Sequence, residues 1–168
     1  MPPSPAEAAG RIIWPDGFAP AVAPVHVRNE LIIAASRELV WAWLVRATRW
    51  PAWYPNSANV KLLPPARDDL AAGVTFTWKT FGVSLTSEVL EWVPQERLAW
   101  NARGLGVYAY HAWLLEDAPG GCRVLTEETQ YGWACRLAAL VFPRRMSQQH
   151  QIWLEQLAKQ AASGAPEV

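Results

Sequence analysis

Apolar and polar residues alternate along much of the chain between residues 25 and 131, a pattern that predicts β-strands with one dry face and one wet face. Short spacers separate these segments, so strands that follow one another are expected to pair in an antiparallel sheet. The predicted strands cover residues 25–33, 59–63, 74–80, 83–93, 97–102, 106–117 and 122–131.

Helical spacing replaces the alternation in two places. After the first strand, Ser36 is a suitable N-cap for one short helix, and Thr48 can cap a second that ends at Pro55. From residue 133 to about residue 162, the apolar spacing predicts a long C-terminal helix. Pro143 should kink this helix or split it in two. One sheet is therefore expected to cover one long helix.

The last two strands predict a hairpin, because a Pro-Gly-Gly cluster separates them. A turn of two or four residues places His111 opposite Glu128 and Trp113 opposite Thr126, on the face that should point inward. A turn of three or five residues would break this pairing, since a slip of one residue brings opposite faces into register. The other face is expected to meet solvent, with Glu116 opposite Arg123, Leu114 opposite Leu125 and Ala112 opposite Glu127.

An imidazole and a carboxylate on an inward face need an explanation. Burying this pair in a dry core would cost several kcal/mol per ion, whereas a cavity that holds water or a ligand removes the difficulty. His111 and Glu128 can form an acid/base pair, because an imidazole with an ordinary pKa near 6.5 suits proton transfer at neutral pH. They can equally contact a ligand, or form a structural hydrogen bond that stabilises the hairpin.

The same alternation, together with helical spacing near the C-terminus, predicts an enclosure with aromatic walls and a few polar points. Eleven tryptophans in the chain fit such an enclosure, since large rings either fill a core or line a cavity for a flat apolar molecule. His150 can be a ligand contact or a buried histidine with satisfied hydrogen bonds. The predicted ligand-contacting residues are Phe76, Trp78, Leu85, Ser87, Trp100, Trp113, Thr126, Gln130, Met146, His150 and Trp153.

Length and composition limit the remaining possibilities. A chain of 168 residues is long enough for one well-buried domain, which we expect over residues 25–163. Residues 1–24 contain six prolines and predict a partly flexible arm that can dock through Ile12, Ile13 and Trp14. Residues 164–168 are expected to form a disordered tail. A monomer or a homodimer is expected.

Charge and cysteine content argue against several partners. Fifteen basic and fifteen acidic residues cancel, so no field of one sign attracts nucleic acid or anionic lipid. Three histidines without recognisable ligand spacing predict no metal, and no other cofactor is expected. The two cysteines are expected to be free thiols in a reducing compartment. No apolar run suffices for a signal peptide or a membrane span, so we expect a cytoplasmic protein without integral membrane association.

The order of elements, together with "ASRELVWAWLVRATRWPAWYP", "SEVLEWVPQERLAW", "HAWLLEDAPGGCRVLTEET" and "WLEQLAKQA", resembles the START-like superfamily, also called SRPBCC. The closest resemblance is to its polyketide cyclase/dehydrase-type members and covers about residues 25–162. It implies an α+β helix-grip fold, in which a curved seven-stranded antiparallel sheet wraps the last helix and leaves a ligand cavity between them. The superfamily has several activities, so the fold alone does not choose the function.

We therefore expect a protein that encloses a small, largely apolar molecule, of aromatic, polycyclic or lipid-like type. One alternative is a polyketide cyclase/dehydrase-type enzyme without a cofactor, in which His111 abstracts a proton next to a carbonyl and Glu128 holds the imidazolium. Another is a chaperone-cofactor-like interaction module that acts through its surface and has a collapsed cavity.

Overall fold

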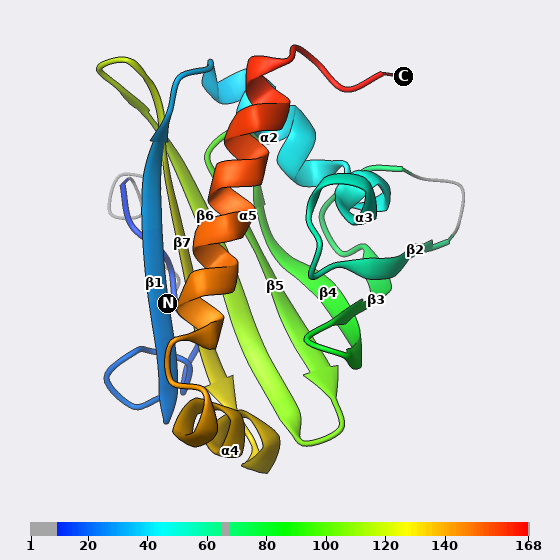
Figure 1. The fold of residues 1–168 in the computed structure, drawn as a ribbon, viewed down its shortest axis with the longest axis vertical. Coiled ribbons are helices and arrows are strands. Elements are labelled where there is room, and N and C mark those ends of the chain that lie inside the picture. Colours follow the sequence, from blue (N-terminus) through cyan, green and yellow to red (C-terminus); the bar gives the residue numbers. More distant parts are fainter. Residues whose placement is uncertain (1–9, 65–67, 168) are drawn as a thin grey trace.

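The computed structural model of the chain describes residues 10–64 and 68–167. In this part of the chain, seven antiparallel strands curve around a long C-terminal helix (Figure 1). The strands are β1 (Val25–Ile33), β2 (Ala58–Leu63), β3 (Thr75–Thr80), β4 (Val83–Val93), β5 (Arg97–Gly104), β6 (Val107–Ala118) and β7 (Gly121–Tyr131). The helices are α2 (Arg37–Val45), the short 3-10 turn η1 (Ala47–Arg49), α3 (Trp50–Trp53), α4 (Trp133–Val141) and α5 (Arg145–Ala162).

The strands form one sheet in the order β1-β7-β6-β5-β4-β3-β2, so the first strand pairs with the last. Helix α5 crosses the concave face of this sheet, and α2 and α3 lie beside its C-terminal half (Figure 1). This arrangement is the predicted helix-grip fold, which is therefore confirmed. Among the described residues, no helix combines the length and the apolar composition that crossing a bilayer requires.

The ends of the helices follow local signals in most places. The Oγ atom of Ser36 accepts the N–H of Leu39 at 3.4 Å and caps α2 as predicted. Thr48 does not cap the next helix, because it lies inside η1 and its hydroxyl donates to the carbonyl of Asp68 instead. Pro143 separates α4 from α5, so the predicted break in the C-terminal helix is confirmed.

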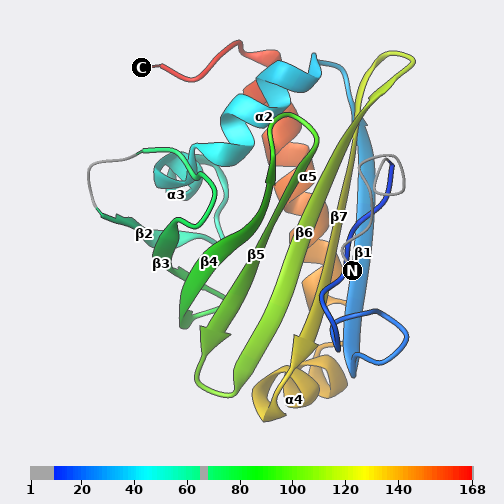
Figure 2. The ribbon, with the colours of Figure 1, turned by 180° about the vertical axis from the view of Figure 1, so that it is seen from behind.

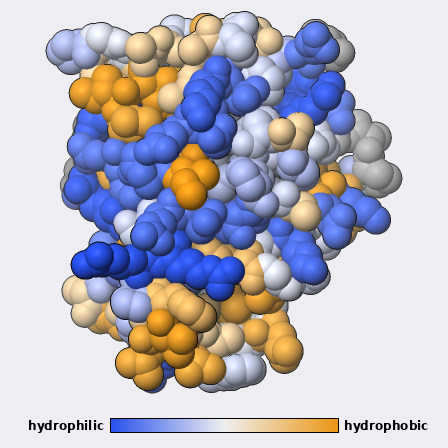
Figure 3. All heavy atoms as spheres, in the orientation of Figure 1, coloured by the Kyte–Doolittle hydropathy of each residue, from blue (hydrophilic) through white to orange (hydrophobic). Residues whose placement is uncertain are grey.

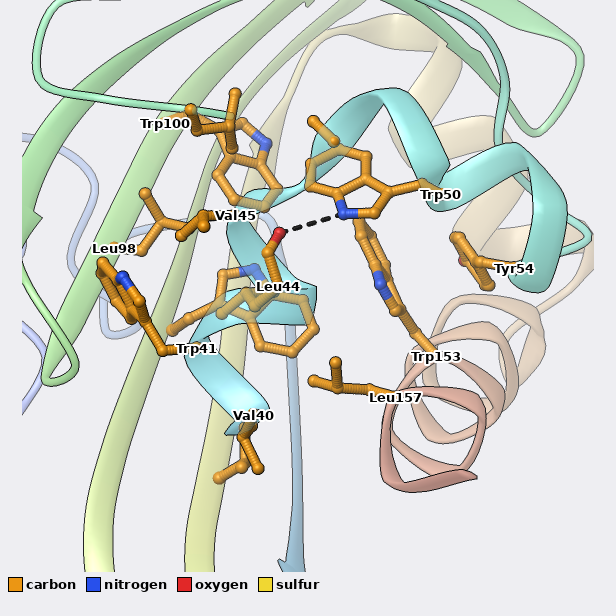
Figure 4. Close-up of a cluster of buried hydrophobic side chains, with 14 of the residues drawn as sticks. Val40, Trp41, Leu44, Val45, Trp50, Tyr54, Leu98, Trp100, Trp153 and Leu157 are labelled. Atoms are coloured by element: carbon orange, nitrogen blue, oxygen red, sulfur yellow. Dashed lines mark hydrogen bonds between the residues drawn. The ribbon is translucent and has the colours of Figure 1, made fainter. Parts of the chain in front are cut away.

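The indole of Trp50 anchors the main core between α3, α5 and the sheet. It is completely buried, and its Nε1–H donates to the carbonyl of Leu44 at 3.0 Å (Figure 4). Its ring centroid lies 5.2 Å from that of Trp153 on α5 and 5.5 Å from that of Trp100 on β5. Edge-to-face and tilted contacts of this kind add to the hydrophobic gain from burying such large rings.

The N-terminal segment covers part of the outer, convex face of the sheet (Figure 2). Three of its side chains pack against the buried residues Ala99, Tyr110 and Ala112: Ile12, Trp14 and Phe18. The expectation that Ala112, Leu114 and Leu125 meet solvent is wrong, since all three are buried. Alternation separates the two faces of a sheet, but it does not show which segment will cover a face. The first nine residues of the predicted arm lie outside the described residues.

Candidate functional site

The hairpin of β6 and β7 has the turn that sets the predicted register. Ala118 pairs with Gly121, so the turn contains only Pro119 and Gly120. Gly120 has a positive φ of 91°, as the third position of a type II turn requires, and proline suits the position before it. His111 consequently pairs with Glu128, and Trp113 pairs with Thr126, as predicted from the sequence.

His111 is held from two sides at the base of the concave face. Its Nδ1 atom lies 3.3 Å from Oε2 of Glu128, and its Nε2 atom lies 2.8 Å from Oγ1 of Thr126. The ring also packs against the indoles of Trp100 and Trp113, with centroids 4.9 Å and 5.2 Å away. A proton on Nδ1 faces the carboxylate, which leaves Nε2 to accept the hydroxyl proton of Thr126.

Helix α5 adds a second histidine to this pair. The Nε2 atom of His150 lies 3.1 Å from the same Oε2 atom of Glu128, while Nε2 of Gln130 donates to Oε1 at 2.7 Å. The rings of His111 and His150 are stacked, with centroids 4.8 Å apart and an angle of 8° between their planes. Glu128 thus links the sheet to α5, and its carboxylate is the hydrogen-bond partner of Nε2 of His150.

Burial and hydrogen bonding determine the charge of this cluster. Burial lowers the pKa of His111 to about 3, and the nearby carboxylate opposes that shift only in part. Burial acts to raise the pKa of Glu128, but the imidazoles of His111 and His150 and the amide of Gln130 outweigh it and lower the pKa to about 2. At neutral pH, Glu128 is therefore ionised while His111 is neutral, and the pair carries one negative charge.

A cavity of about 380 Å³ opens beside this cluster, between the sheet, α4 and α5. Seven of the predicted ligand-contacting residues line it: Trp78, Leu85, Trp100, Gln130, Met146, His150 and Trp153. His111 and Glu128 also line it. The exposed lining residues Phe142, Pro143 and Arg145 lie at the junction of α4 and α5, so the cavity opens to solvent there. The predicted combination of aromatic walls and a few polar points is present in this space.

The other predicted ligand-contacting residues are buried beyond the cavity wall. Phe76 and Trp113 pack among the core indoles, and Thr126 holds His111 from behind. The Oγ atom of Ser87 accepts the Nε1–H of Trp78 at 3.1 Å, so it orients a wall residue. Alternation placed these residues on the correct face of the sheet. It did not show which positions along each strand border the cavity.

Several lining residues are absent from the predicted ligand-contacting set. Tyr54, which follows α3, lines the cavity and stacks on Trp153 with centroids 4.4 Å apart. The start of β1 and most of α4 also contribute, including Cys135 and Phe142. The helical spacing of residues 133–142 was a usable signal for α4, whereas no local signal places this helix against the cavity.

The described residues contain one cluster whose ligand atoms are close enough together for a metal ion: His111, Glu128 and His150, within 4.8 Å of one another. A histidine binds a metal in the plane of its ring. The two rings are stacked and nearly parallel, so one ion cannot lie in both planes unless a ring rotates. In their present orientation, these residues form a cluster in which two histidines contact one carboxylate.

The curved antiparallel sheet, the C-terminal helix and the cavity between them define a START-like helix-grip protein. Residues 24–162 match the family described as "Polyketide cyclase / dehydrase and lipid transport", and the chain belongs to this family. No match to the chain was found among curated proteins.

Solved structures agree with this assignment. The chain is similar to the hypothetical protein jhp0584 from Helicobacter pylori, with 30% identity, a TM-score of 0.84, and coverage of 90% of this chain and 96% of that one. It is also similar in fold to the Zhui aromatase/cyclase from Streptomyces sp. R1128, with 15% identity, a TM-score of 0.67, and coverage of 84% and 99%. TTHA0849 from Thermus thermophilus has 18% identity and a TM-score of 0.69, with coverage of 84% and 100%.

Proposed function

We propose that this protein binds a small, largely apolar aromatic molecule in the cavity between the sheet and α5. The observation that carries the proposal is the combination of indole walls with an ionised carboxylate in one cavity. Trp78, Trp100 and Trp153 form part of the cavity wall, while Glu128 and Gln130 offer polar contacts. A volume of about 380 Å³ is in the range typical of small-molecule sites.

The charge of the cluster restricts the ligand further. The carboxylate of Glu128 accepts hydrogen bonds, and among the described residues no lysine or arginine lies within ion-pair distance of it, so a ligand that donates a hydrogen bond suits it. A phenolic or amino group satisfies this requirement. A carboxylate placed in the same position would meet like charge in a setting of low dielectric constant, which is unfavourable. The preferred ligand is therefore a neutral aromatic hydroxyl or amine compound.

Matched ligands test this proposal. Quenching of tryptophan fluorescence, supported by native mass spectrometry, should detect binding of 2-naphthol and much weaker binding of 2-naphthoate. Glu128→Gln should reduce the difference between the two ligands. Ala102→Leu, which fills part of the cavity, should weaken naphthol binding, while Ala52→Leu, at an exposed position of α3 away from this cavity, should not. Equal binding of both ligands, or no binding across a wider aromatic and lipid panel, would contradict the proposal.

The enzyme alternative keeps the same cavity and adds acid/base chemistry by His111. The contact between His111 and Glu128 favours it, because a carboxylate orients the ring and stabilises an imidazolium. The lowered pKa of His111 weighs against it, since a base with a pKa of about 3 draws a proton weakly at neutral pH. A chaperone-cofactor-like module with a collapsed cavity is supported least, given the size of the space.

A further inference from the structure

Helix α4 has apolar residues on both of its sides. Its inner side, with Ala134, Cys135 and Ala139, lines the cavity. Its outer side is open to solvent. Five large apolar side chains there are each more than half exposed: Trp133, Leu137, Leu140, Val141 and the following Phe142. A helix that is apolar all round is usually buried in a protein core or in lipid.

The exposed residues of α4 form a patch rather than a scatter. The described residues include eleven large hydrophobic side chains that are exposed, and five of them fall within residues 133–142. A sixth, Leu105, is 81% exposed on the turn between β5 and β6. The neighbouring Gly106 lies against the indole of Trp133, so this turn extends the patch. Figure 3 shows the hydrophobic surface gathered over α4 at the foot of the molecule.

The charged residues within the stretch that carries the patch are all basic. Residues 129–154 contain no aspartate or glutamate, while Arg136, Arg144 and Arg145 lie in this stretch and are exposed. Among the described residues, none of the three arginines forms an ion pair. The net charge of zero for the whole chain conceals this local excess, so the expectation that nothing attracts anionic lipid does not hold for this surface.

We propose that the apolar side of α4 and the β5–β6 turn form a surface, the α4 surface, that docks on an anionic lipid bilayer. Leucine and phenylalanine side chains would enter the boundary of the acyl chains, and Trp133 suits the interface because its ring is both apolar and a hydrogen-bond donor. The three arginines would lie at the level of the headgroups and bind lipid phosphates. This mode is peripheral and needs no membrane-spanning helix.

A second copy of the chain fits this surface less well. Two copies that met through their α4 surfaces would bring six unpaired arginines together, and like charges facing each other are unfavourable in an interface. An anionic bilayer supplies both the apolar layer and the opposite charge. The area is also continuous with the mouth of the cavity at Phe142, Pro143 and Arg145. If the proposed function holds, docking would let an apolar ligand pass between the bilayer and the cavity without crossing water.

Vesicle flotation tests the docking directly and does not depend on any cavity ligand. The protein should float with vesicles of phosphatidylcholine and phosphatidylglycerol in equal amounts, and it should bind vesicles of phosphatidylcholine alone more weakly. High salt should reduce this difference in binding between the two kinds of vesicle, because it screens the charges. Leu137→Glu should weaken binding to the mixed vesicles by about tenfold or more. Leu90→Glu is the matched control, because Leu90 is equally exposed on β4 and should leave binding unchanged.

Two further variants separate the roles of charge and insertion. Arg136→Gln combined with Arg144→Gln should reduce binding to the mixed vesicles and leave binding to phosphatidylcholine unchanged, whereas Arg49→Gln should have no effect. Brominated lipids should quench the tryptophan fluorescence of the protein, and Trp133→Phe should remove most of that quenching. Circular dichroism and thermal unfolding would verify that each variant folds.

Three results would overturn the docking proposal. The first is failure of the unchanged protein to float with either vesicle, and the second is equal flotation of Leu137→Glu. The third is a concentration-dependent dimer in sedimentation velocity that Leu137→Glu abolishes while no vesicle binding is seen. A null result in the aromatic ligand panel would remove the proposed function and leave the docking proposal untouched.

Discussion

The Nε2 atom of His150 on α5 lies 3.1 Å from Oε2 of Glu128 on β7. This contact joins the last helix to the sheet through a carboxylate that also faces Nδ1 of His111. A buried ionised carboxylate is stabilised by hydrogen-bond donors from several elements. Its removal should therefore destabilise both α5 and the β6–β7 hairpin.

Glu128→Gln should lower the free energy of unfolding by about 1 to 3 kcal/mol, because both imidazoles lose a charged acceptor while the volume is kept. Urea unfolding followed by far-UV circular dichroism measures this loss. Glu127→Gln is a suitable control: Glu127 is the next residue and about equally exposed, but it points to the outer face and pairs with His26 and Arg28. A loss from Glu127→Gln as large as that from Glu128→Gln would contradict the assignment.

Stability should fall as the pH decreases from 6.5 toward 3. The pKa of His111 is lowered from 6.5 to about 3, so in this window the unfolded chain binds a proton that the folded chain does not. Glu128, with a pKa lowered to about 2, adds a further loss below about pH 4.5. Denaturant unfolding between pH 7 and pH 5 should show the first effect alone. His111→Gln should flatten the profile there, and an unchanged slope would refute the buried neutral imidazole.

Thr126 and Thr129 on β7 provide a matched pair of substitutions. Both are completely buried, but Oγ1 of Thr126 bonds to His111 while Oγ1 of Thr129 has no partner among the described residues. Thr126→Val should destabilise the protein by about 1 to 3 kcal/mol, because it leaves Nε2 of His111 unpaired. Thr129→Val should be neutral or stabilising, because it removes an unsatisfied buried hydroxyl. Thermal unfolding of both variants decides the matter, and the reverse order would be evidence against this hydrogen-bond assignment.

If an aromatic ligand proves to be turned over, His111→Gln should abolish turnover and leave ligand binding largely intact. The reason is that glutamine retains a polar side chain in the pocket but cannot exchange a proton as imidazole does. Parallel measurement of product formation and of fluorescence quenching separates the two properties. Turnover that survives the substitution would eliminate the acid/base alternative.

The cross-strand pairing of His111 with Glu128 could be predicted from the sequence because its causes are local. Side chains alternate with a period of two along a strand, and Pro119 with Gly120 forms a turn of even length. The family resemblance added the curved sheet and the helix that it wraps, and both are confirmed. These features depend on patterns that are repeated along many residues, so a single ambiguous position does not change them.

Tertiary structure alone decided the rest. His150 reaches Glu128 because of how α5 packs on the sheet, and the two residues are far apart in the sequence. Alternation could not distinguish Trp78, which lines the cavity, from Phe76, which fills the core on the same face. The sequence predicts that residues 133–141 form an apolar helix, but only the tertiary structure shows that one side of α4 is left exposed. Periodicity specifies the face toward which a side chain points. The burial of that side chain and the residues that it contacts follow from packing over the whole molecule.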